Sequence, residues 1–321
     1  MKKIVLAFIL CLQSMALQAA SVHDRTSLDV GDAQIFLEVS GPDRSAPLLL
    51  FLHGGPGSVA HLVMFQATSG RLLEQSFLVA YLHQRGTGRS SQVPKAQQTI
   101  ANNVSDVNHV VRYLMQTYGH KQVNIVGHSW GGMLAASYVT VHPEHTRRLA
   151  LIATAMNFKQ LLRHTYEGDL QWAKQTGNHE ALAQLTTLTQ AFDTPDHFGV
   201  VLSWADRAGG VASNFDMDAF LRAKQVDMDF PNWKSQQQQA NAALIPEMLK
   251  LDLTRSMKHL RIPVLFMSGG LDTIVREVTM RKDFENYEGP KSFVRLDRSH
   301  HLPFIDESVE LADELRAFFS P

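Results

Sequence analysis

The chain has 321 residues, of which 45% are hydrophobic and 19% charged, and its formal net charge is −1. This length and apolar content provide a full core for one large α/β domain with an insertion, or for two smaller domains. The near-neutral charge, without a basic stretch or tail, gives no reason to expect nucleic-acid binding.

The first twenty residues have the pattern of a secretory signal peptide. Two lysines precede an apolar run over residues 4–12, and small residues follow at 16–20. A membrane anchor is the alternative, but the apolar run is too short to span a bilayer and is interrupted at Gln13. We therefore expect cleavage after Ala19 or Ala20 and an exported protein, periplasmic or secreted, without a stable membrane anchor.

Strand and helix patterns alternate along the rest of the chain. Residues 26–30 and 33–39 alternate in polarity about a Gly-Asp pair and predict a β-hairpin. Further apolar runs predict strands at 47–52, 76–82, 122–126, 148–153, 262–267 and 291–296. Helical spacing predicts helices at 104–118, 133–139, 273–287 and 307–319. This alternation predicts an α/β fold with a mostly parallel, doubly wound sheet.

One segment departs from this alternation. Residues 156–249 are polar, rich in glutamine and free of long β-type runs, yet apolar residues recur throughout. We interpret the segment as a helical insertion rather than a disordered linker. The predicted organisation is a signal peptide at 1–20, a core formed by 21–155 and 260–321, and a helical cap over 156–259.

The clearest chemical motif is Gly-His-Ser-Trp-Gly at residues 127–131. It has the Gly-x-Ser-x-Gly form of a nucleophile elbow, and a predicted strand precedes it while a predicted helix follows. Such a turn crowds the backbone at Ser129, so that Gly127 and Gly131 must lack side chains. The alternative is a chance match in a loop, but the flanking strand and helix favour Ser129 as a nucleophile.

A serine hydroxyl needs a base, and in this arrangement the acid and the histidine follow the serine on later loops. Asp272 directly follows a predicted strand, and no Asp or Glu lies between Glu144 and Glu167 to offer another acid. A turn or helix-cap aspartate is the alternative interpretation of Asp272. His300 and His301 both follow the last predicted strand, and their positions alone leave open which is the base.

The tetrahedral intermediate of acyl transfer requires hydrogen-bond donors for its oxyanion. Trp130, the residue after the nucleophile, offers one backbone N–H, and Gly55 within the His-Gly-Gly-Pro-Gly loop at 53–57 offers a second. A plain Gly/Pro turn is the alternative for this loop; a phosphate loop is excluded because its lysine and spacing are absent. The chemistry requires no cofactor, and no cluster of His, Cys and Asp has the spacing of a metal site.

Four motifs carry a resemblance to a known family: His-Gly-Gly-Pro-Gly at 53–57, Gln-Arg-Gly-Thr-Gly-Arg-Ser at 84–90, Gly-His-Ser-Trp-Gly-Gly at 127–132 and Gly-Leu-Asp at 270–272. Together they resemble the α/β-hydrolase superfamily and, more narrowly, its proline iminopeptidase branch. The match covers most of residues 26–155 and 260–321. The His-x-Pro-Phe ending of that family is similar to residues 301–304, which selects His301 over His300.

The resemblance implies a hydrolase with a Ser129–Asp272–His301 triad and a helical cap, which releases N-terminal residues, typically proline, from small peptides. Two positions depart from the family: His83 stands where an aspartate is usual, and the Trp-Glu pair that holds the substrate amine has only a loose counterpart at 204–206. An esterase or lactonase acting on small acyl substrates is the alternative function. A binding protein without activity is a remote one, disfavoured by the intact triad.

An aminopeptidase must hold a cationic α-amine beside the scissile bond, and burying that charge without a partner is costly. The sequence therefore predicts that at least one acidic residue of the cap faces Ser129. The candidates are Glu167, Asp169, Asp206, Asp216 and Asp218.

Overall fold

The computed structural model describes residues 21–188, 192–210, 215–224 and 232–320. The predicted signal peptide, residues 1–20, therefore lies outside the described residues. Among the residues that are described, none of the helices combines the length and the apolar character needed to cross a membrane.

Eight strands of the described chain form one sheet: β1 (Val22–Asp29), β2 (Gln34–Gly41), β3 (Leu48–Leu52), β4 (Leu78–Leu82), β5 (Val123–His128), β6 (Thr146–Ile152), β7 (Val264–Gly269) and β8 (Lys291–Leu296). Their order across the sheet is β1-β2-β4-β3-β5-β6-β7-β8. The β1–β2 and β2–β4 pairs are antiparallel, and every pair from β4 to β8 is parallel. The predicted α/β fold with a mostly parallel sheet is confirmed.

The helices of the described residues are α1 (Val59–Phe65), α2 (Arg71–Leu73), α3 (Ile100–Tyr118), α4 (Trp130–Val141), α5 (Phe158–Thr176), α6 (His179–Thr186), α7 (Pro195–Arg207), α8 (Met217–Ala223), α9 (Trp233–Met248), α10 (Thr254–Lys258), α11 (Glu277–Asn286), α12 (Pro303–Asp306) and α13 (Ser308–Phe319). Short turns of π-helix, η1 (Gln66–Gly70), and of 3₁₀-helix, η2 (Lys95–Gln97) and η3 (Pro143–His145), complete the set.

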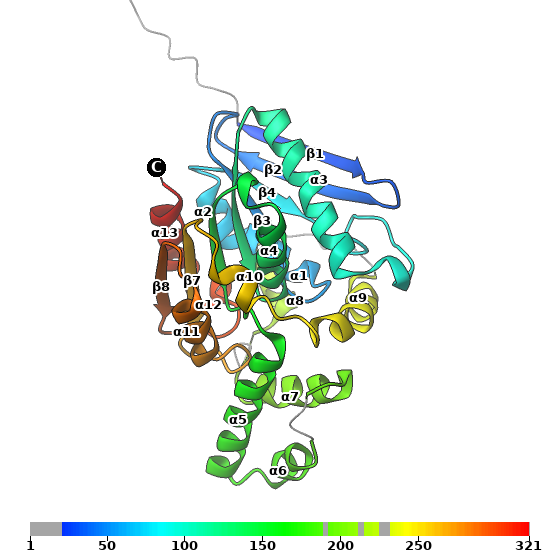
Figure 1. Cartoon of the computed structure of the whole chain (residues 1–321), viewed down its shortest axis with the longest axis vertical. Helices are drawn as coiled ribbons and strands as arrows, with labels where there is room; N and C mark the ends of the chain where they lie inside the picture. Colours follow the sequence, from blue (N-terminus) through cyan, green and yellow to red (C-terminus); the bar gives the residue numbers. More distant parts are fainter. Residues whose placement is uncertain (1–20, 189–191, 211–214, 225–231, 321) are drawn as a thin grey trace, which may run out of the picture.

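Helices cover both faces of the sheet, as a doubly wound fold requires (Figure 1). Alternate residues of β3 belong to different hydrophobic clusters: Leu48, Leu50 and Leu52 pack with α3 and α4, whereas Leu49 and Phe51 pack with α1 and α13. Successive side chains of a strand point to opposite faces, so a strand covered on both sides must be apolar throughout. All five residues of β3 are buried.

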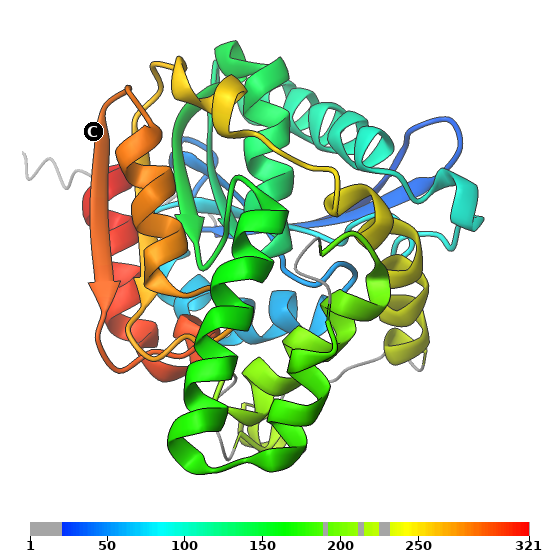
Figure 2. The same cartoon turned by 60° about the horizontal axis from the view of Figure 1, so that its bottom comes forward.

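The chain between β6 and β7 is helical in its described part and carries α5 to α10. Figures 1 and 2 show α5, α6 and α7 projecting together from one end of the sheet. The side chain of Asn157 accepts the N–H of Gln160 at the start of α5, and Gly177 ends that helix at φ 66°. The inserted helices begin shortly after the carboxyl end of the parallel strand β6.

Candidate active site

Ser129 occupies the sharp turn between β5 and α4, with φ 54° and ψ −123°. A positive φ is rare for a residue with a side chain, and here it is imposed by the tight strand-to-helix reversal. A Cβ on Gly127 would lie 2.5 Å from the carbonyl oxygen of Gly131, and one on Gly131 would lie 2.0 Å from that of Leu52. Both glycines are thus required by close backbone approach.

The structure brings Ser129, His301 and Asp272 into one chain of hydrogen bonds. His301 Nε2 lies 3.1 Å from Ser129 Oγ, and His301 Nδ1 lies 2.9 Å from Asp272 Oδ2. The Asp272 side chain is fully buried, and its other oxygen accepts the N–H groups of Ile274 and Val275 at 2.8 Å each. The backbone therefore fixes one oxygen of the carboxylate, and the other oxygen faces the imidazole.

His300, the competing histidine, does not join this chain. Its ring Nδ1 lies 3.3 Å from Asp306 Oδ2, and its backbone N–H donates to the same oxygen at 2.8 Å. Asp306 closes α12, which begins with the Pro-Phe pair of the last motif. His300 thus anchors the loop, whereas His301 faces the serine.

The backbone of His301 is held by a residue that sequence reasoning missed. His128 donates from Nε2 to the His301 carbonyl oxygen at 2.8 Å, and the His301 N–H donates to the Gly210 carbonyl at 2.9 Å. Burial lowers the pKa of His128 well below its ordinary value, so the ring is neutral and one nitrogen donates. The position of His128 directly before Ser129 was the only signal in the sequence.

The two predicted oxyanion donors lie at the same cavity as Ser129. Trp130 is the first residue of α4, and a backbone N–H at this position has no acceptor within its own helix. Gly55 has φ 131°, and its N–H has no hydrogen-bond acceptor among the described residues. Both groups are therefore available to a negatively charged oxygen near Ser129.

A second motif of the sequence fixes the loop of Gly55 against the elbow. Gln84 donates from Nε2 to the His53 carbonyl oxygen at 2.7 Å and accepts the Trp130 indole N–H at 2.9 Å. The neighbouring Arg85 makes two charge-assisted hydrogen bonds to the buried Asp106, at 2.9 and 2.7 Å. The Gln-Arg-Gly motif therefore has a positioning role that the sequence alone did not reveal.

His83, which stands where the resemblance leads one to expect an aspartate, acts as a hydrogen-bond acceptor. Its ring Nδ1 accepts the backbone N–H of Arg89 at 3.2 Å. Burial, with smaller contributions from His53 and Arg89, lowers the pKa of His83 to about 3. A neutral histidine thus accepts a hydrogen bond here, as a carboxylate would, without adding a charge.

Ser129 opens into a cavity of about 520 Å³ that the inserted helices close on one side. Its lining is mainly apolar: α5 contributes Phe158, and α7 contributes Phe198 and Val201. Asp206, at the end of α7, is the only acidic residue among the described residues that line it. The cavity therefore combines an apolar wall with one carboxylate, as small-molecule sites commonly do.

The other acidic candidates of the cap lie elsewhere. Glu167 and Asp218 are exposed, and Asp216 accepts a backbone N–H as the N-cap of α8. Asp169 is fully buried and pairs with Arg276 at 3.3 Å. None of these four lines the cavity, so among the five candidates only Asp206, itself exposed, shares the cavity with Ser129.

Comparison with known proteins assigns the chain to a family. Residues 47–308 match the family described as alpha/beta hydrolase fold. The chain belongs to that family, and it is a hydrolase. Its sequence resembles the proline iminopeptidase branch, as predicted.

This hydrolase is 24% identical to the probable aminopeptidase YbaC of Bacillus subtilis (strain 168), in an alignment covering 92% of this chain and 96% of that protein. It is also 24% identical to a proline iminopeptidase of Lactobacillus delbrueckii subsp. bulgaricus, over 90% and 95% of the two chains. The crystal structure of a proline iminopeptidase from Mycobacterium smegmatis superposes with a TM-score of 0.65 at 18% identity, covering 92% and 97% of the chains.

Proposed function

We propose that this hydrolase is a serine aminopeptidase that releases an uncharged N-terminal residue, proline first, from small peptides. The observation that carries the proposal is the hydrogen-bonded chain from Ser129 through His301 to Asp272, which opens into an apolar cavity containing one carboxylate, Asp206. The two full-length relatives described above, whose names specify aminopeptidase activity, support the same class of substrate.

The proposed mechanism follows from the order of the hydrogen bonds. Ser129 Oγ attacks the scissile carbonyl carbon while His301 Nε2 accepts the hydroxyl proton. Asp272 holds the imidazole in the reactive tautomer and stabilises the imidazolium. The N–H groups of Gly55 and Trp130 bind the oxyanion. His301 then donates the proton to the leaving amine, and a water molecule repeats the sequence on the acyl-enzyme.

Asp206 is the group we assign to the substrate α-amine. That amine is largely cationic below its pKa of about 8, and it requires a partner once it leaves water. Asp206 makes no ion pair with any cationic residue of the described chain, so its carboxylate is available. The ring of an N-terminal proline is apolar and suits the wall formed by Phe158 and Phe198.

The first experiment compares kcat/KM for prolyl-β-naphthylamide with that for its N-acetylated form. Blocking the amine should lower kcat/KM by about 10²-fold, because it removes the cationic partner of the Asp206 carboxylate beside the scissile bond. Equal rates on the two substrates would contradict the aminopeptidase assignment.

The second experiment tests Asp206 directly. Asp206→Asn should lower kcat/KM on prolyl-β-naphthylamide by about 10-fold or more, while leaving the rate on p-nitrophenyl acetate unchanged. Glu167→Gln is the matched control, since Glu167 is an exposed cap acid that does not line the cavity. A loss of similar size on both substrates would show that Asp206 acts on the fold rather than on the amine.

The alternative is an esterase or lactonase acting on small acyl substrates. The apolar character of the cavity and the solvent exposure of Asp206 favour it, because an uncharged acyl group needs no counter-ion. Hydrolysis of p-nitrophenyl esters without any hydrolysis of aminoacyl amides would select this function and leave the Ser129 chemistry unchanged.

A further inference from the structure

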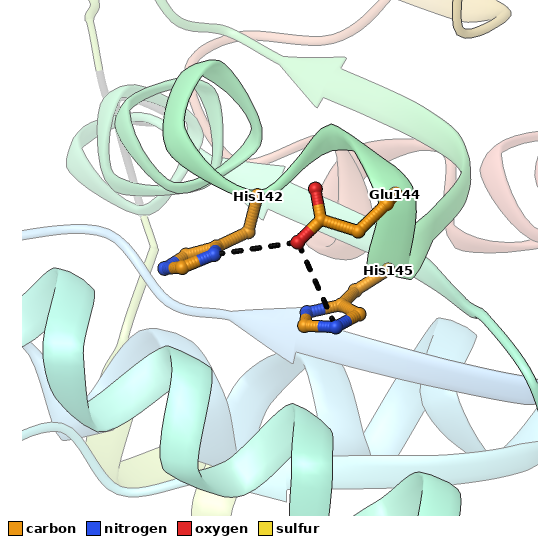
Figure 3. Close-up of side chains that lie close together, drawn as sticks. All are labelled: His142, Glu144 and His145. Atoms are coloured by element: carbon orange, nitrogen blue, oxygen red, sulfur yellow. Dashed lines mark ion pairs between the residues drawn. The ribbon is translucent and has the colours of Figure 1, made fainter.

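A cluster of three metal-ligating side chains lies outside the active site. His142, Glu144 and His145 converge where α4 ends and the 3₁₀ turn η3 begins, as Figure 3 shows. Their imidazole nitrogens and the carboxylate oxygen all lie within 4.8 Å of one another. From the sequence, no cluster of His, Cys and Asp was expected to have the spacing of a metal site, and these three residues were not singled out.

The contacts of Glu144 with the two imidazoles are longer than an ordinary hydrogen bond. Glu144 Oε1 lies 3.5 Å from His142 Nδ1 and 3.7 Å from His145 Nε2. An N–H···O hydrogen bond usually spans about 2.7–3.2 Å. A tetrahedral Zn²⁺ ion with bonds of about 2.0–2.1 Å places neighbouring ligand atoms about 3.3–3.4 Å apart. The two distances from Glu144 are therefore close to the spacing of ligands around a common ion, and the two imidazole nitrogens lie within 4.8 Å of each other.

A buried hydroxyl behind the cluster orients one of the histidines. Tyr138 Oη lies 3.3 Å from His145 Nδ1, and the Tyr138 residue is fully buried. With Nδ1 protonated and donating to this oxygen, Nε2 of His145 carries the lone pair and lies 3.7 Å from Glu144 Oε1. Metal-ligating histidines almost always use their second nitrogen in this way, because it fixes the tautomer and the ring orientation.

The backbone around the cluster also favours a cation. His142 is the C-cap of α4, and the carboxyl end of a helix carries a partial negative charge. Ser129 lies at the opposite end of α4, about 18 Å away at 1.5 Å per residue. An ion bound here is therefore remote from the reacting atoms, and it would connect the end of α4 to the start of β6.

We propose that His142, Glu144 and His145 bind one Zn²⁺ ion, which staples the turn between α4 and β6 and takes no part in hydrolysis. Two imidazoles and one carboxylate form a donor set that suits zinc. The Glu144 side chain is 60% exposed, so water can reach the cluster.

The test is calorimetric titration of the chelator-treated protein with Zn²⁺. The wild-type protein should bind one equivalent, and its Tm should rise on binding. His145→Ala and Glu144→Gln should abolish stoichiometric binding. Tyr138→Phe keeps all three ligands and should weaken the affinity by about 10- to 100-fold, because it removes only the orienting hydroxyl. His179→Ala, which removes an exposed histidine of the cap, is the matched control and should bind like the wild type.

Glu144→Gln guards against a folding defect, because it replaces an exposed side chain by one of the same length. Hydrolysis of p-nitrophenyl acetate by this variant and by the chelator-treated protein should equal that of the zinc-loaded wild type. The proposal is overturned if zinc fails to bind, or if stoichiometric binding persists in His145→Ala and Glu144→Gln. A loss of hydrolysis on removing zinc would overturn the structural role.

Discussion

At His301, the ring and the main chain are fixed by separate partners. Asp272 and Ser129 face the two ring nitrogens, whereas His128 and Gly210 hold the carbonyl and the N–H. A catalytic base is effective only when its nitrogen stays in line with the nucleophile, and small displacements lower the rate strongly. The buried neutral ring of His128 thus contributes to the geometry without adding a second charge next to the imidazole.

Covalent labelling tests the nucleophile. A fluorophosphonate should modify the protein at one site, and Ser129→Ala should abolish that labelling, because among the described residues lining the cavity only this serine is paired with a histidine base. Ser203, which lines the same cavity, provides the matched control through Ser203→Ala. Labelling that persists in Ser129→Ala would remove Ser129 from the mechanism and would revive the interpretation as a binding protein.

The two adjacent histidines offer an internal comparison. His301→Ala should lower kcat by about 10³-fold or more, because the serine loses its base. His300→Ala should have a much smaller effect, since His300 contacts Asp306 rather than Ser129. Steady-state rates on p-nitrophenyl acetate measure both. A larger loss in His300→Ala would mean that the final loop is assigned to the wrong histidine.

At the scale of elements, α4 lies so close to β3 that their contact excludes even a methyl group. A Cβ on Gly131 would lie 2.0 Å from the Leu52 carbonyl oxygen, which belongs to rigid backbone. Gly131→Ala should therefore lower the free energy of unfolding by about 3 kcal/mol or more, as measured by urea denaturation. Gly199→Ala in α7 meets nothing within 4 Å and should stabilise the helix slightly. A tolerated Gly131→Ala would refute the close approach.

The junction between β6 and the inserted helices contains a buried acid, Asp283 of α11. Its Oδ2 accepts the N–H of Met156 at 2.8 Å. Burial, opposed by this hydrogen bond and reinforced by Asp252, raises the pKa of Asp283 to about 7. The folded chain then retains a proton that the unfolded chain releases near pH 4, so stability falls as the pH rises through this window.

The pH dependence gives a specific prediction for this junction. Between about pH 5 and pH 8, Asp283 should lower the free energy of unfolding by about 3 kcal/mol, at 1.36 kcal/mol per pKa unit. Asp283→Asn retains an acceptor for the Met156 N–H but has no proton to lose. Urea denaturation at about pH 5 and about pH 8 should therefore show a smaller decline in its free energy of unfolding. Glu285→Gln, an exposed change on the same helix, should retain the full decline. An identical decline in Asp283→Asn would show that this carboxyl does not titrate in that range.

Local patterns were enough to predict the elements, but not their contacts. Apolar runs located the parallel strands, whereas β1 begins at Val22, earlier than predicted, because its polar edge residues have no apolar signature. The predicted helix at 273–287 begins only at Glu277, since Asp272 first binds the next N–H groups in a turn. Asp272 thus lies next to His301, as expected for the acid of the triad, and also caps a turn, as the alternative interpretation predicted.

The positioning residues were missed because their partners are distant in the sequence. Gln84 contacts His53 and Trp130, which lie 31 and 46 residues away, and His128 contacts His301 across 173 residues. No local periodicity encodes such pairs. Motif spacing was therefore enough to predict the three residues of the triad. The residues that position them, Gln84 and His128, could be identified only from the three-dimensional structure.

At the scale of the whole molecule, the described fold starts where the predicted export signal ends. Strand β1 begins at Val22, directly after the predicted cleavage sites. We propose that the protein is exported and that residues 1–20 are removed. N-terminal sequencing of the exported protein should find Ala20 or Ser21 first. Retention in the membrane fraction with Met1 intact would instead favour the anchor.

The backbone conformation of Ser129 has a consequence for the stability of the entire fold. A residue with a Cβ at φ 54° is strained by about 1–3 kcal/mol, and this strain is present whether or not substrate is bound. Glycine adopts such angles freely, so Ser129→Gly should be more stable than Ser129→Ala by about 1 kcal/mol. Both variants lack the nucleophile, and the relief of strain in Ser129→Gly exceeds the extra backbone entropy that glycine gives the unfolded chain. Selection for a higher melting temperature alone would thus favour an inactive protein, and this elbow persists only where hydrolysis itself is under selection.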